Sequence, residues 1–453
     1  MGQLFGTNGV RGVTNKDLTI EKVTLLVASA GSYLGSEIGI GTDGRVTSPM
    51  FKEAAIAGLL SAGCKVTDFG HVTTPALQYI VKNSSLDGGI MITASHNPPE
   101  FNGVKVMASD GVEVSRQQEN EIEDIYFKGG PELAQWDNVG DITTGNAIDE
   151  YCKGVISHVN VNAIKQAGLK IAVDPGNGVA ALTAPRIAQS LGCQVNTVNV
   201  DIDGTFPNRS SEPRPDNLNL LQLLVKSTGS DLGIAFDGDG DRALFVDEKG
   251  EVYWGDKSFA LVTDDFVKSN PGSNVATPVS SSQVIADIVS SNGGKVVWTE
   301  VGSVVVSRKM VNDNIMLGGE ENGGIMYGPH IQTRDGSMAM ALILDIMARE
   351  GKPLSELFRG LPQYMQAKDK VECPEELKGK VLERLKEKAD APEVETIDGV
   401  KIKYPDGRWV LFRPSGTEPI FRIYAEADSQ LDANTLVSEN KRLIERVVEE
   451  LTG

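Results

Sequence analysis

Histidine and cysteine are scarce in this chain, which has four of each among its 453 residues. The cysteines lie far apart without a Cys-x-x-Cys pair, and no two histidines are close in sequence. We therefore expect neither a disulfide framework nor a zinc site built from these residues, but reduced thiols in a cytoplasmic protein. The residues concerned are Cys64, Cys152, Cys193, Cys373, His71, His96, His158 and His330.

Basic residues and long apolar runs are also in short supply. Lysine and arginine number 43 against 62 aspartates and glutamates, which gives a net charge of −19. Neither nucleic acid nor a membrane is expected as a partner, because both bind basic surfaces. No apolar run approaches the ~18 residues of a membrane span, and the first residues lack the basic segment and apolar core of a signal peptide. An anionic substrate would need local arginines to overcome the negative field.

What the chain does contain is an acidic run, Asp237-Gly-Asp-Gly-Asp-Arg242, between two apolar segments. Its carboxylates alternate with glycines, which permit the tight backbone fold that directs their oxygens to one point. Hard oxygen ligands suit Mg²⁺ or Ca²⁺ better than zinc. We predict a metal site at Asp237, Asp239 and Asp241, and a solvated acidic turn is the alternative.

A calcium-binding EF-hand loop is a further alternative for this run. It requires carboxylates at positions 1, 3 and 5, glycine at position 6 and glutamate at position 12. Glu248 does occupy the last of these positions counted from Asp237, but Arg242 stands where glycine is needed. The flanking segments 232–236 and 243–246 resemble buried strands, whereas an EF-hand needs helices. A calcium module is therefore disfavoured.

Three segments repeat one pattern, in which a helical periodicity ends, a glycine follows and a β-rich run begins. An apolar run precedes each segment, and another follows it and ends in an unusual loop. Strands that alternate with helices predict α/β sheets, in which ligands bind at loops beyond the strand ends. Any α/β protein shows some of this alternation, which is the simpler explanation of the repeat. The segments are 58–66, 187–195 and 288–296, with the glycines at Gly63, Gly192 and Gly293.

We predict an α/β fold of three similar repeat domains with mixed sheets, followed by a small C-terminal α+β domain. The C-terminal domain is expected to hold strands between 395 and 427 and an amphipathic helix over 431–451. The predicted domains are 1–147 with the loop 93–98, 148–249 with the loop 237–242, 250–364 with the loop 318–324, and 365–453 with the loop 413–419.

The first loop, Thr93-Ala-Ser95-His96-Asn-Pro98, follows a predicted buried strand. A serine on such a turn can act as a nucleophile. The motif is not the Gly-x-Ser-x-Gly elbow of hydrolases. His96 is the immediate neighbour of Ser95 on a tight turn, so we do not expect the two side chains to face each other, and a Ser-His-Asp triad is disfavoured. A purely structural turn is the alternative.

Two further loops carry side chains suited to a sugar phosphate. In the loop 413–419, a guanidinium, hydroxyls and backbone N–H groups can form a phosphate cradle. In the loop 318–324, Glu320 and Asn322 offer acceptors and donors for vicinal sugar hydroxyls. An ordinary β-turn and a solvated glycine loop are the respective alternatives. The candidate phosphate-binding residues are Arg413, Ser415, Gly416 and Thr417.

Taken in order, these four motifs resemble those of the α-D-phosphohexomutases, and the archaeal-type members in particular. The opening Phe5-Gly-Thr-Asn-Gly-Val-Arg11-Gly12 is similar to that of phosphoglucosamine mutases, and the likeness spans nearly the whole chain. The resemblance implies four domains arranged as a heart around a central cleft, with one loop from each domain facing it.

The resemblance also implies a chemistry. The 1-phosphate of a hexose or hexosamine is converted into the 6-phosphate, and the reverse, through a phosphoserine at Ser95. A hexose 1,6-bisphosphate is both the intermediate and the activator. Mg²⁺ is held by the three aspartates and by one oxygen of the phosphoserine. Lys105 is the implied base, although it could be an ordinary surface lysine. The implied catalytic residues are Ser95, Lys105, Arg11, Arg242 and His96.

The resemblance is compatible with more than one hexose phosphate as the substrate. We expect a phosphoglucosamine mutase that is a monomer or a homodimer, with a dual phosphoglucomutase/phosphomannomutase and a non-catalytic sugar-phosphate sensor as alternatives. Many relatives carry histidine directly after the Gly-Glu-x-Ser-Gly run, where this chain has Gly324, and Asn322 replaces the serine. His330 could replace that histidine or could have a structural role.

Overall fold

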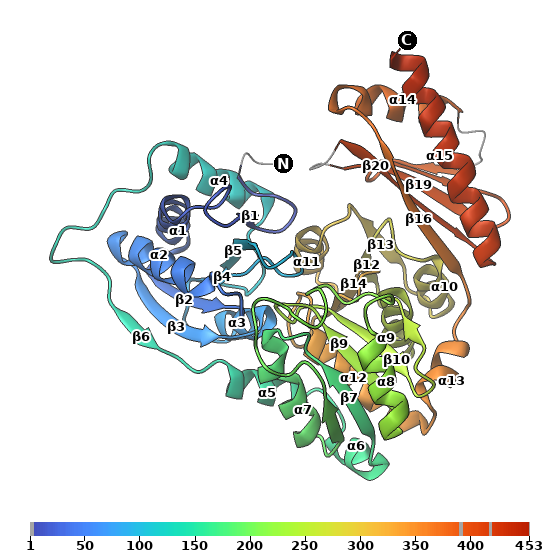
Figure 1. Cartoon of the computed structure of the whole chain (residues 1–453), viewed down its shortest axis with the longest axis horizontal. Helices are drawn as coiled ribbons and strands as arrows, with labels where there is room; N and C mark the ends of the chain where they lie inside the picture. Colours follow the sequence, from blue (N-terminus) through green and yellow to red (C-terminus); the bar gives the residue numbers. More distant parts are fainter. Residues whose placement is uncertain (1–3, 389–392, 416–418, 453) are drawn as a thin grey trace.

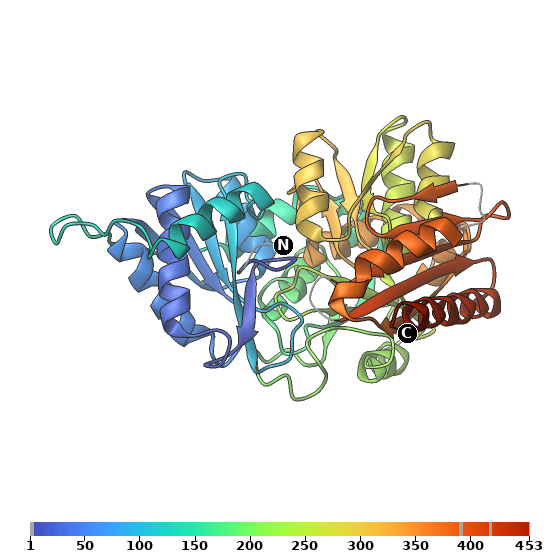
Figure 2. The same ribbon diagram turned by 90° about the horizontal axis from the view of Figure 1, so that it is seen from above.

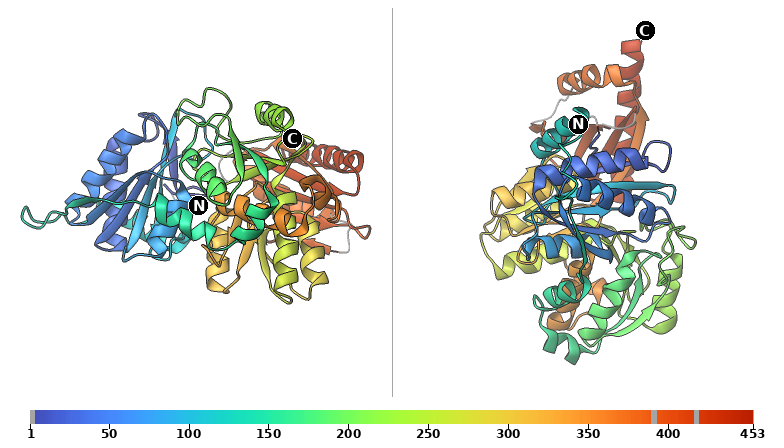
Figure 3. Two further views of the ribbon diagram at one scale, coloured as in Figure 1. Left: turned by 90° about the horizontal axis from the view of Figure 1, so that it is seen from below. Right: turned by 90° about the vertical axis from the view of Figure 1, so that its left-hand side faces the viewer.

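The computed structural model describes residues 4–388, 393–415 and 419–452, which form four units that we call domains I to IV. Each domain is built on one sheet and packs helices against it. The sheets of domains I and IV lie at opposite ends of the molecule (Figures 1 and 2), and the view from below shows the same arrangement (Figure 3, left). None of the described helices is long and apolar enough to cross a membrane.

Domain I has a sheet of six strands in the order β1-β5-β4-β2-β3-β6. Helices α1, α2 and α4 share one apolar core with the sheet, and α3 contributes to a second core that continues into domains II and III. The strands are β1 (Val10–Val13), β2 (Glu37–Thr42), β3 (Lys65–His71), β4 (Gly88–Ile92), β5 (Phe101–Ala108) and β6 (Ile142–Thr144), and the helices are α1 (Ile20–Leu34), α2 (Ser48–Ser61), α3 (Thr74–Lys82) and α4 (Arg116–Phe127).

Domain II has five strands in the order β11-β10-β9-β7-β8. Every residue of its two central hairpin strands is buried, as the apolar flanks of the acidic run predicted. The strands are β7 (Lys170–Asp174), β8 (Gln194–Thr197), β9 (Leu232–Phe236), β10 (Ala243–Asp247) and β11 (Val252–Tyr253), and the helices are α5 (Ile148–Ile156), α6 (Val161–Ala167), η1 (Val179–Leu182), α7 (Ala184–Ser190) and α8 (Asn219–Thr228).

Domain III has four strands in the order β13-β12-β14-β15. Its helix α12 is buried along most of its length and packs against helices of domain II. The strands are β12 (Val275–Pro278), β13 (Val296–Thr299), β14 (Leu317–Gly319) and β15 (Ile325–Tyr327), and the helices are α9 (Gly255–Ser269), α10 (Gln283–Ser291), α11 (Ser303–Asn312), α12 (Gly336–Glu350) and α13 (Leu354–Arg359).

Domain IV is an antiparallel sheet in the order β16-β20-β19-β18-β17 with two helices. The expected final helix is present, but the charged edge strand β16 and helix α14 were not anticipated. The lysine, aspartate and glutamate residues of β16 have low strand propensity, so its sequence does not predict a strand; pairing with β20 makes it one. The elements are β16 (Met365–Glu372), η2 (Glu375–Leu377), α14 (Lys378–Lys388), β17 (Glu393–Glu395), β18 (Val400–Lys403), β19 (Trp409–Pro414), β20 (Ile420–Ala427) and α15 (Gln430–Thr452).

The strand order confirms the threefold repeat and the mixed sheets. Domains I, II and III share the orders β3-β2-β4-β5, β8-β7-β9-β10 and β13-β12-β14-β15, in which three parallel strands are followed by one antiparallel strand. The repeated glycines Gly63, Gly192 and Gly293 have φ of 85°, 86° and 79°, so each ends its helix in the left-handed conformation. In each of domains I to III the predicted functional loop joins the third strand of this shared order to the antiparallel fourth strand, namely β4 to β5, β9 to β10 and β14 to β15.

Candidate active site

Ser95 lies in the loop between β4 and β5 and is fully buried. Its φ of 51° is unusual for a residue with a side chain and is a strained conformation that the surroundings must maintain. The backbone N–H of Ser95 donates to Thr93 Oγ1 at 2.8 Å, and its hydroxyl donates to Asp237 Oδ2 at 3.0 Å. The first two predicted loops therefore meet at the candidate nucleophile.

Arg45, which the sequence analysis missed, holds this loop in place. Its guanidinium is 1% exposed and donates to the carbonyl oxygens of Ser95, Asn97, Pro98 and Phe101 at 2.6 to 3.0 Å. Asp43 orients it through an ion pair of 3.0 Å. The available signal was position, because Arg45 follows the end of the buried strand β2, where site residues of α/β sheets gather.

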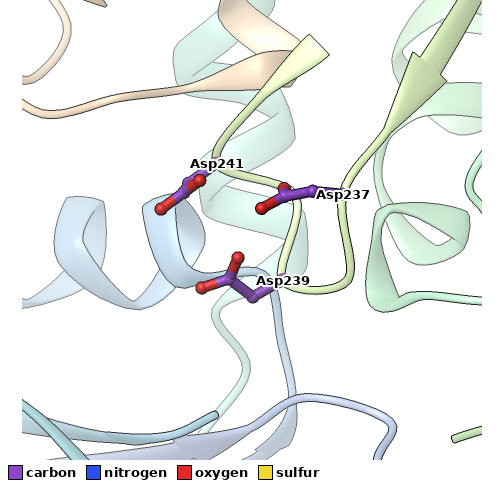
Figure 4. Close-up of side chains that lie close together, drawn as sticks. All are labelled: Asp237, Asp239 and Asp241. Carbon is purple, nitrogen blue, oxygen red and sulfur yellow. The ribbon is translucent and has the colours of Figure 1, made fainter. Parts of the chain in front are cut away.

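The three aspartates of the acidic run lie in the hairpin loop between β9 and β10, and their carboxylate groups point toward one another (Figure 4). One carboxylate oxygen from each lies within 4.8 Å of the others. Gly238 permits this hairpin to approach the serine loop, because a Cβ there would lie 2.6 Å from the carbonyl oxygen of Ser95. The converging residues are Asp237, Asp239 and Asp241.

These carboxylates fit a divalent cation. Among the described residues, the buried atoms Asp239 Oδ1 and Asp241 Oδ1 have no hydrogen-bond partner, although their second oxygens do. Burial, together with the charges of Asp241 and Asp239, raises the pKa of Asp237 well above its ordinary value. A cation held between the three residues would bind the unpartnered oxygens and offset this repulsion. The residues present therefore suit a hard metal ion.

Lys105 is buried in β5 beside the aspartates, so it is not the ordinary surface lysine considered above. Its Nζ lies 2.7 Å from Asp239 Oδ2 and 3.1 Å from Asp241 Oδ2. Burial opposes the charge on this amine, but the two carboxylates outweigh burial and raise the pKa of Lys105. In this arrangement Lys105 is a cation.

Arg11 and Arg242 supply further positive charge around Ser95. Arg11 donates to the side chain of Asn97 at 2.8 Å, and burial lowers its pKa to about 10, which leaves it charged at neutral pH. Arg242 NH1 lies 3.4 Å from the carboxylate of Glu212. These arginines are the local cations that the negative net charge of the chain made necessary.

His96 does face Ser95, contrary to the expectation from its position on the turn. Its Nδ1 lies 3.4 Å from Ser95 Oγ and 3.0 Å from Arg242 NH2. The charge of Arg242, followed by burial, holds the pKa of His96 far below its ordinary value. An imidazole whose protonation is opposed in this way is a poor base, so a Ser-His-Asp triad remains disfavoured.

Glu320 and Asn322 lie in the loop between β14 and β15. Arg334 connects this loop with the acidic run 237–242. Arg334 donates to Glu320 Oε2 at 3.1 Å and to Asp241 Oδ2 at 2.6 Å. Burial raises the pKa of Glu320, and Arg334 partly offsets this effect. Asn322 Oδ1 accepts a hydrogen bond from the N–H of Gly324. Arg334 lies outside the four motifs and was not among the predicted site residues.

Arg334 also occupies the space beside Gly324, the position at which the resemblance led us to expect a histidine. A Cβ at Gly324 would lie only 2.3 Å from Arg334 Cδ. His330 is instead buried against Tyr79, with its ring stacked at a centroid distance of 4.5 Å. Of the two roles considered for His330, its surroundings favour the structural one.

The fourth loop is only partly described, because Gly416 and Thr417 lie outside the described residues. Arg413 donates to Asp398 Oδ2 at 2.6 Å, and the same oxygen accepts from the N–H of Val301 at 2.9 Å. Ser415 accepts a hydrogen bond from Lys378 at its carbonyl oxygen. Arg413 is thus tied to domain III, on which domain IV is docked.

Comparisons with known proteins agree with this arrangement. Profiles described as phosphoglucomutase/phosphomannomutase domains match residues 2–132 (alpha/beta/alpha domain I), 149–250 (domain II), 254–365 (domain III) and 370–443 (C-terminal domain). The crystal structure of a phosphoglucomutase/phosphomannomutase family protein from Burkholderia thailandensis superposes with a TM-score of 0.87 at 28% identity, over 97% of each chain.

Archaeal relatives share more of the sequence. The phosphoglucosamine/phosphogalactosamine mutase of Sulfurisphaera tokodaii is 43% identical, covering 98% of this chain and 100% of the relative. The phosphoglucomutase/phosphomannomutase of Thermococcus kodakarensis is 40% identical over 99% of this chain and 100% of the relative. With all four domains matched in order, the chain belongs to the phosphoglucomutase/phosphomannomutase family and is a phosphomutase, an isomerase that transfers a phosphoryl group within its substrate.

Proposed function

We propose that this phosphomutase interconverts glucosamine 1-phosphate and 6-phosphate. The observation that carries the proposal is the meeting of three loops: Ser95 Oγ lies 3.0 Å from Asp237 Oδ2, and Arg334 joins Asp241 to Glu320. The candidate nucleophile, the candidate metal ligands and the candidate sugar-binding carboxylate are thereby adjacent. The archaeal relative from Sulfurisphaera tokodaii, named a phosphoglucosamine/phosphogalactosamine mutase, supports the choice of an amino sugar.

In the proposed reaction, Ser95 carries a phosphoryl group in the resting enzyme. A free sugar hydroxyl attacks the phosphorus, the bond from phosphorus to Ser95 Oγ breaks, and a hexose 1,6-bisphosphate forms. The bisphosphate reorients within the site so that its other phosphate faces Ser95. Ser95 Oγ then attacks that phosphorus, the bond from phosphorus to the sugar oxygen breaks, and the phosphoserine is restored. Arg11 and Arg242 are placed to stabilise the charge of the group in transfer.

The three aspartates would hold Mg²⁺, with an oxygen of the phosphoserine as a further ligand. When bound, this ion neutralises the charge of the phosphoryl group in transfer. Lys105 is the proposed partner for the proton of the attacking hydroxyl. In the described arrangement its amine is charged and paired with Asp239 and Asp241, so it must lose a proton before it can accept one.

Glu320 and Asn322 are proposed to bind O3 and O4 of the sugar, and Arg413 with Ser415, Gly416 and Thr417 to bind the phosphate that is not reacting. This arrangement leaves C2 with few contacts, which is the reason to keep a second candidate. A dual phosphoglucomutase/phosphomannomutase must accept both configurations at C2, and the Thermococcus kodakarensis relative bears that name.

The test is kcat/KM on the 1-phosphates of glucosamine, glucose and mannose, with Mg²⁺ and a trace of the hexose 1,6-bisphosphate. A preference of ~100-fold for glucosamine phosphate, about 2.7 kcal/mol in transition-state binding, is the expected result. Similar rates on glucose and mannose phosphates would replace it with the dual activity. Tight binding of these compounds without turnover of any would indicate a sensor and overturn the proposal.

A further inference from the structure

A buried polar cluster lies directly behind Arg334. It consists of Tyr151, His330 and Asp335, which are 0%, 2% and 1% exposed. Asp335 follows Arg334 in the chain and caps helix α12, because its Oδ1 accepts from the N–H of Met338 at 2.9 Å. The same oxygen accepts from the hydroxyl of Tyr151 at 2.6 Å.

The second half of the cluster holds polar atoms without partners. Among the described residues, both ring nitrogens of His330 and the Oδ2 atom of Asp335 lack a hydrogen bond. His330 Nε2 lies 3.5 Å from this oxygen, so a movement of about 0.5 Å would bring the two atoms to hydrogen-bond distance. Burial of polar atoms without hydrogen bonds lowers the stability of the fold, so the presence of this pair calls for an explanation.

The cluster brings three domains together. Tyr151 belongs to α5 of domain II, whereas His330 and Asp335 belong to domain III. Helix α3 of domain I completes the junction, because Tyr79 stacks on His330 and Lys82 donates to the His330 carbonyl oxygen at 2.9 Å. The segment 330–335 is therefore attached to domains I, II and III, which carry the serine loop, the acidic run and the loop of Glu320.

A further hydrogen bond holds the segment 330–335 between its two ends. Thr333 donates to the side chain of Gln78 in α3 at 2.9 Å, and both residues are buried. The next residue is Arg334, whose guanidinium donates hydrogen bonds to Asp241 and Glu320. The backbone next to Arg334 is thus fixed by a contact with helix α3, outside the four predicted functional loops.

We propose that Tyr151, Asp335 and His330 are positioning residues for Arg334. By fixing the segment 330–335 at the three-domain junction, they hold the guanidinium where it bridges the metal-binding carboxylate of Asp241 and the sugar-binding carboxylate of Glu320. This role rests on the proposed function of the site, since Arg334 matters for catalysis only if Asp241 and Glu320 do.

The test is the variant Tyr151→Phe, which keeps the ring and removes the hydrogen bond to Asp335. We expect kcat to fall at least tenfold, because a catalytic group displaced by about 1 Å can lose ~100-fold in rate. Tyr79→Phe is the matched control: it makes the same change on the other tyrosine beside His330, and no described hydrogen bond joins the Tyr79 hydroxyl to Asp335. This control should retain wild-type kcat.

A double-mutant cycle separates positioning from general destabilisation. If Tyr151 acts through Arg334, Tyr151→Phe should have little effect on kcat in an Arg334→Ala background. Equal effects in both backgrounds, or wild-type kcat in Tyr151→Phe, would overturn the proposal. Turnover by the wild-type enzyme tests the proposed function separately. A crystal structure of Tyr151→Phe needs no turnover: Arg334 still bridging Asp241 and Glu320 would also overturn the positioning role.

Discussion

Gly324 is expected to be intolerant of even a methyl group, because of its contact with Arg334. A Cβ at Gly324 would lie 2.3 Å from Arg334 Cδ and 2.8 Å from Arg334 Cγ. These atoms lie in the middle of the arginine side chain, so they cannot move without displacing its guanidinium. That guanidinium is buried and bonded to Asp241 and Glu320. Gly324→Ala should therefore weaken both bonds.

The size of the effect follows from those two bonds. Removal of one partner from a buried ion pair costs ~3–5 kcal/mol. Gly324→Ala leaves the charge of Arg334 in place but displaces it, so a part of this energy is lost. We expect kcat/KM to fall by about 100-fold, which corresponds to about 2.7 kcal/mol of transition-state stabilisation.

Steady-state kinetics on the preferred hexose phosphate measure this loss. Gly379→Ala is the control, because Gly379 lies in α14 and a Cβ there would meet nothing within 4 Å. In an Arg334→Ala background the clash is gone, so Gly324→Ala should add little further loss. A Gly324→Ala enzyme within twofold of the wild-type kcat/KM would refute the reasoning.

Three other variants test separate parts of the structure. Ser95→Ala should lower kcat by at least ~1,000-fold, the scale of nucleophile removal, and near-normal turnover would exclude a phosphoserine. Arg45→Lys should lower kcat and the unfolding midpoint together, because lysine cannot replace the forked donors to four carbonyl oxygens, and unchanged values would contradict that role. Burial raises the pKa of Asp256 to about 7, so the folded state binds this proton more tightly than the unfolded state. The contribution of Asp256 to the free energy of unfolding should therefore fall by up to about 4 kcal/mol from pH 4 to 7, and Asp256→Asn should remove this contribution from the pH dependence of thermal unfolding.

Much of the fold could be predicted from the sequence, because its signals are local. The glycines at Gly63, Gly192 and Gly293 marked three helix ends, and the apolar runs around them became β strands. Strand β16 escaped prediction, since its alternating charged residues are those of a solvated edge and only pairing with β20 makes it a strand. The domain boundaries and the roles of the individual site residues stay predictions.

The sequence by itself determined which chemical groups the loops carry. Alternating aspartates and glycines supply carboxylate oxygens that come together in any fold that closes the hairpin, and a serine after a buried strand supplies a hydroxyl at the end of that strand. These properties depend on residues within a few positions of each other, so spacing along the chain is enough to recognise them.

Only the tertiary structure decided how the loops are held and charged. Arg45 contacts the serine loop from about fifty positions away, and Arg334 contacts Asp241 across 93 positions. It also decided that Lys105 is a cation, because the pKa of a buried amine depends on which carboxylates the fold places beside it. Contacts between distant residues arise from the packing of elements within a domain, as for Arg45, and of domains on one another, as for Arg334. No local pattern in the sequence encodes either.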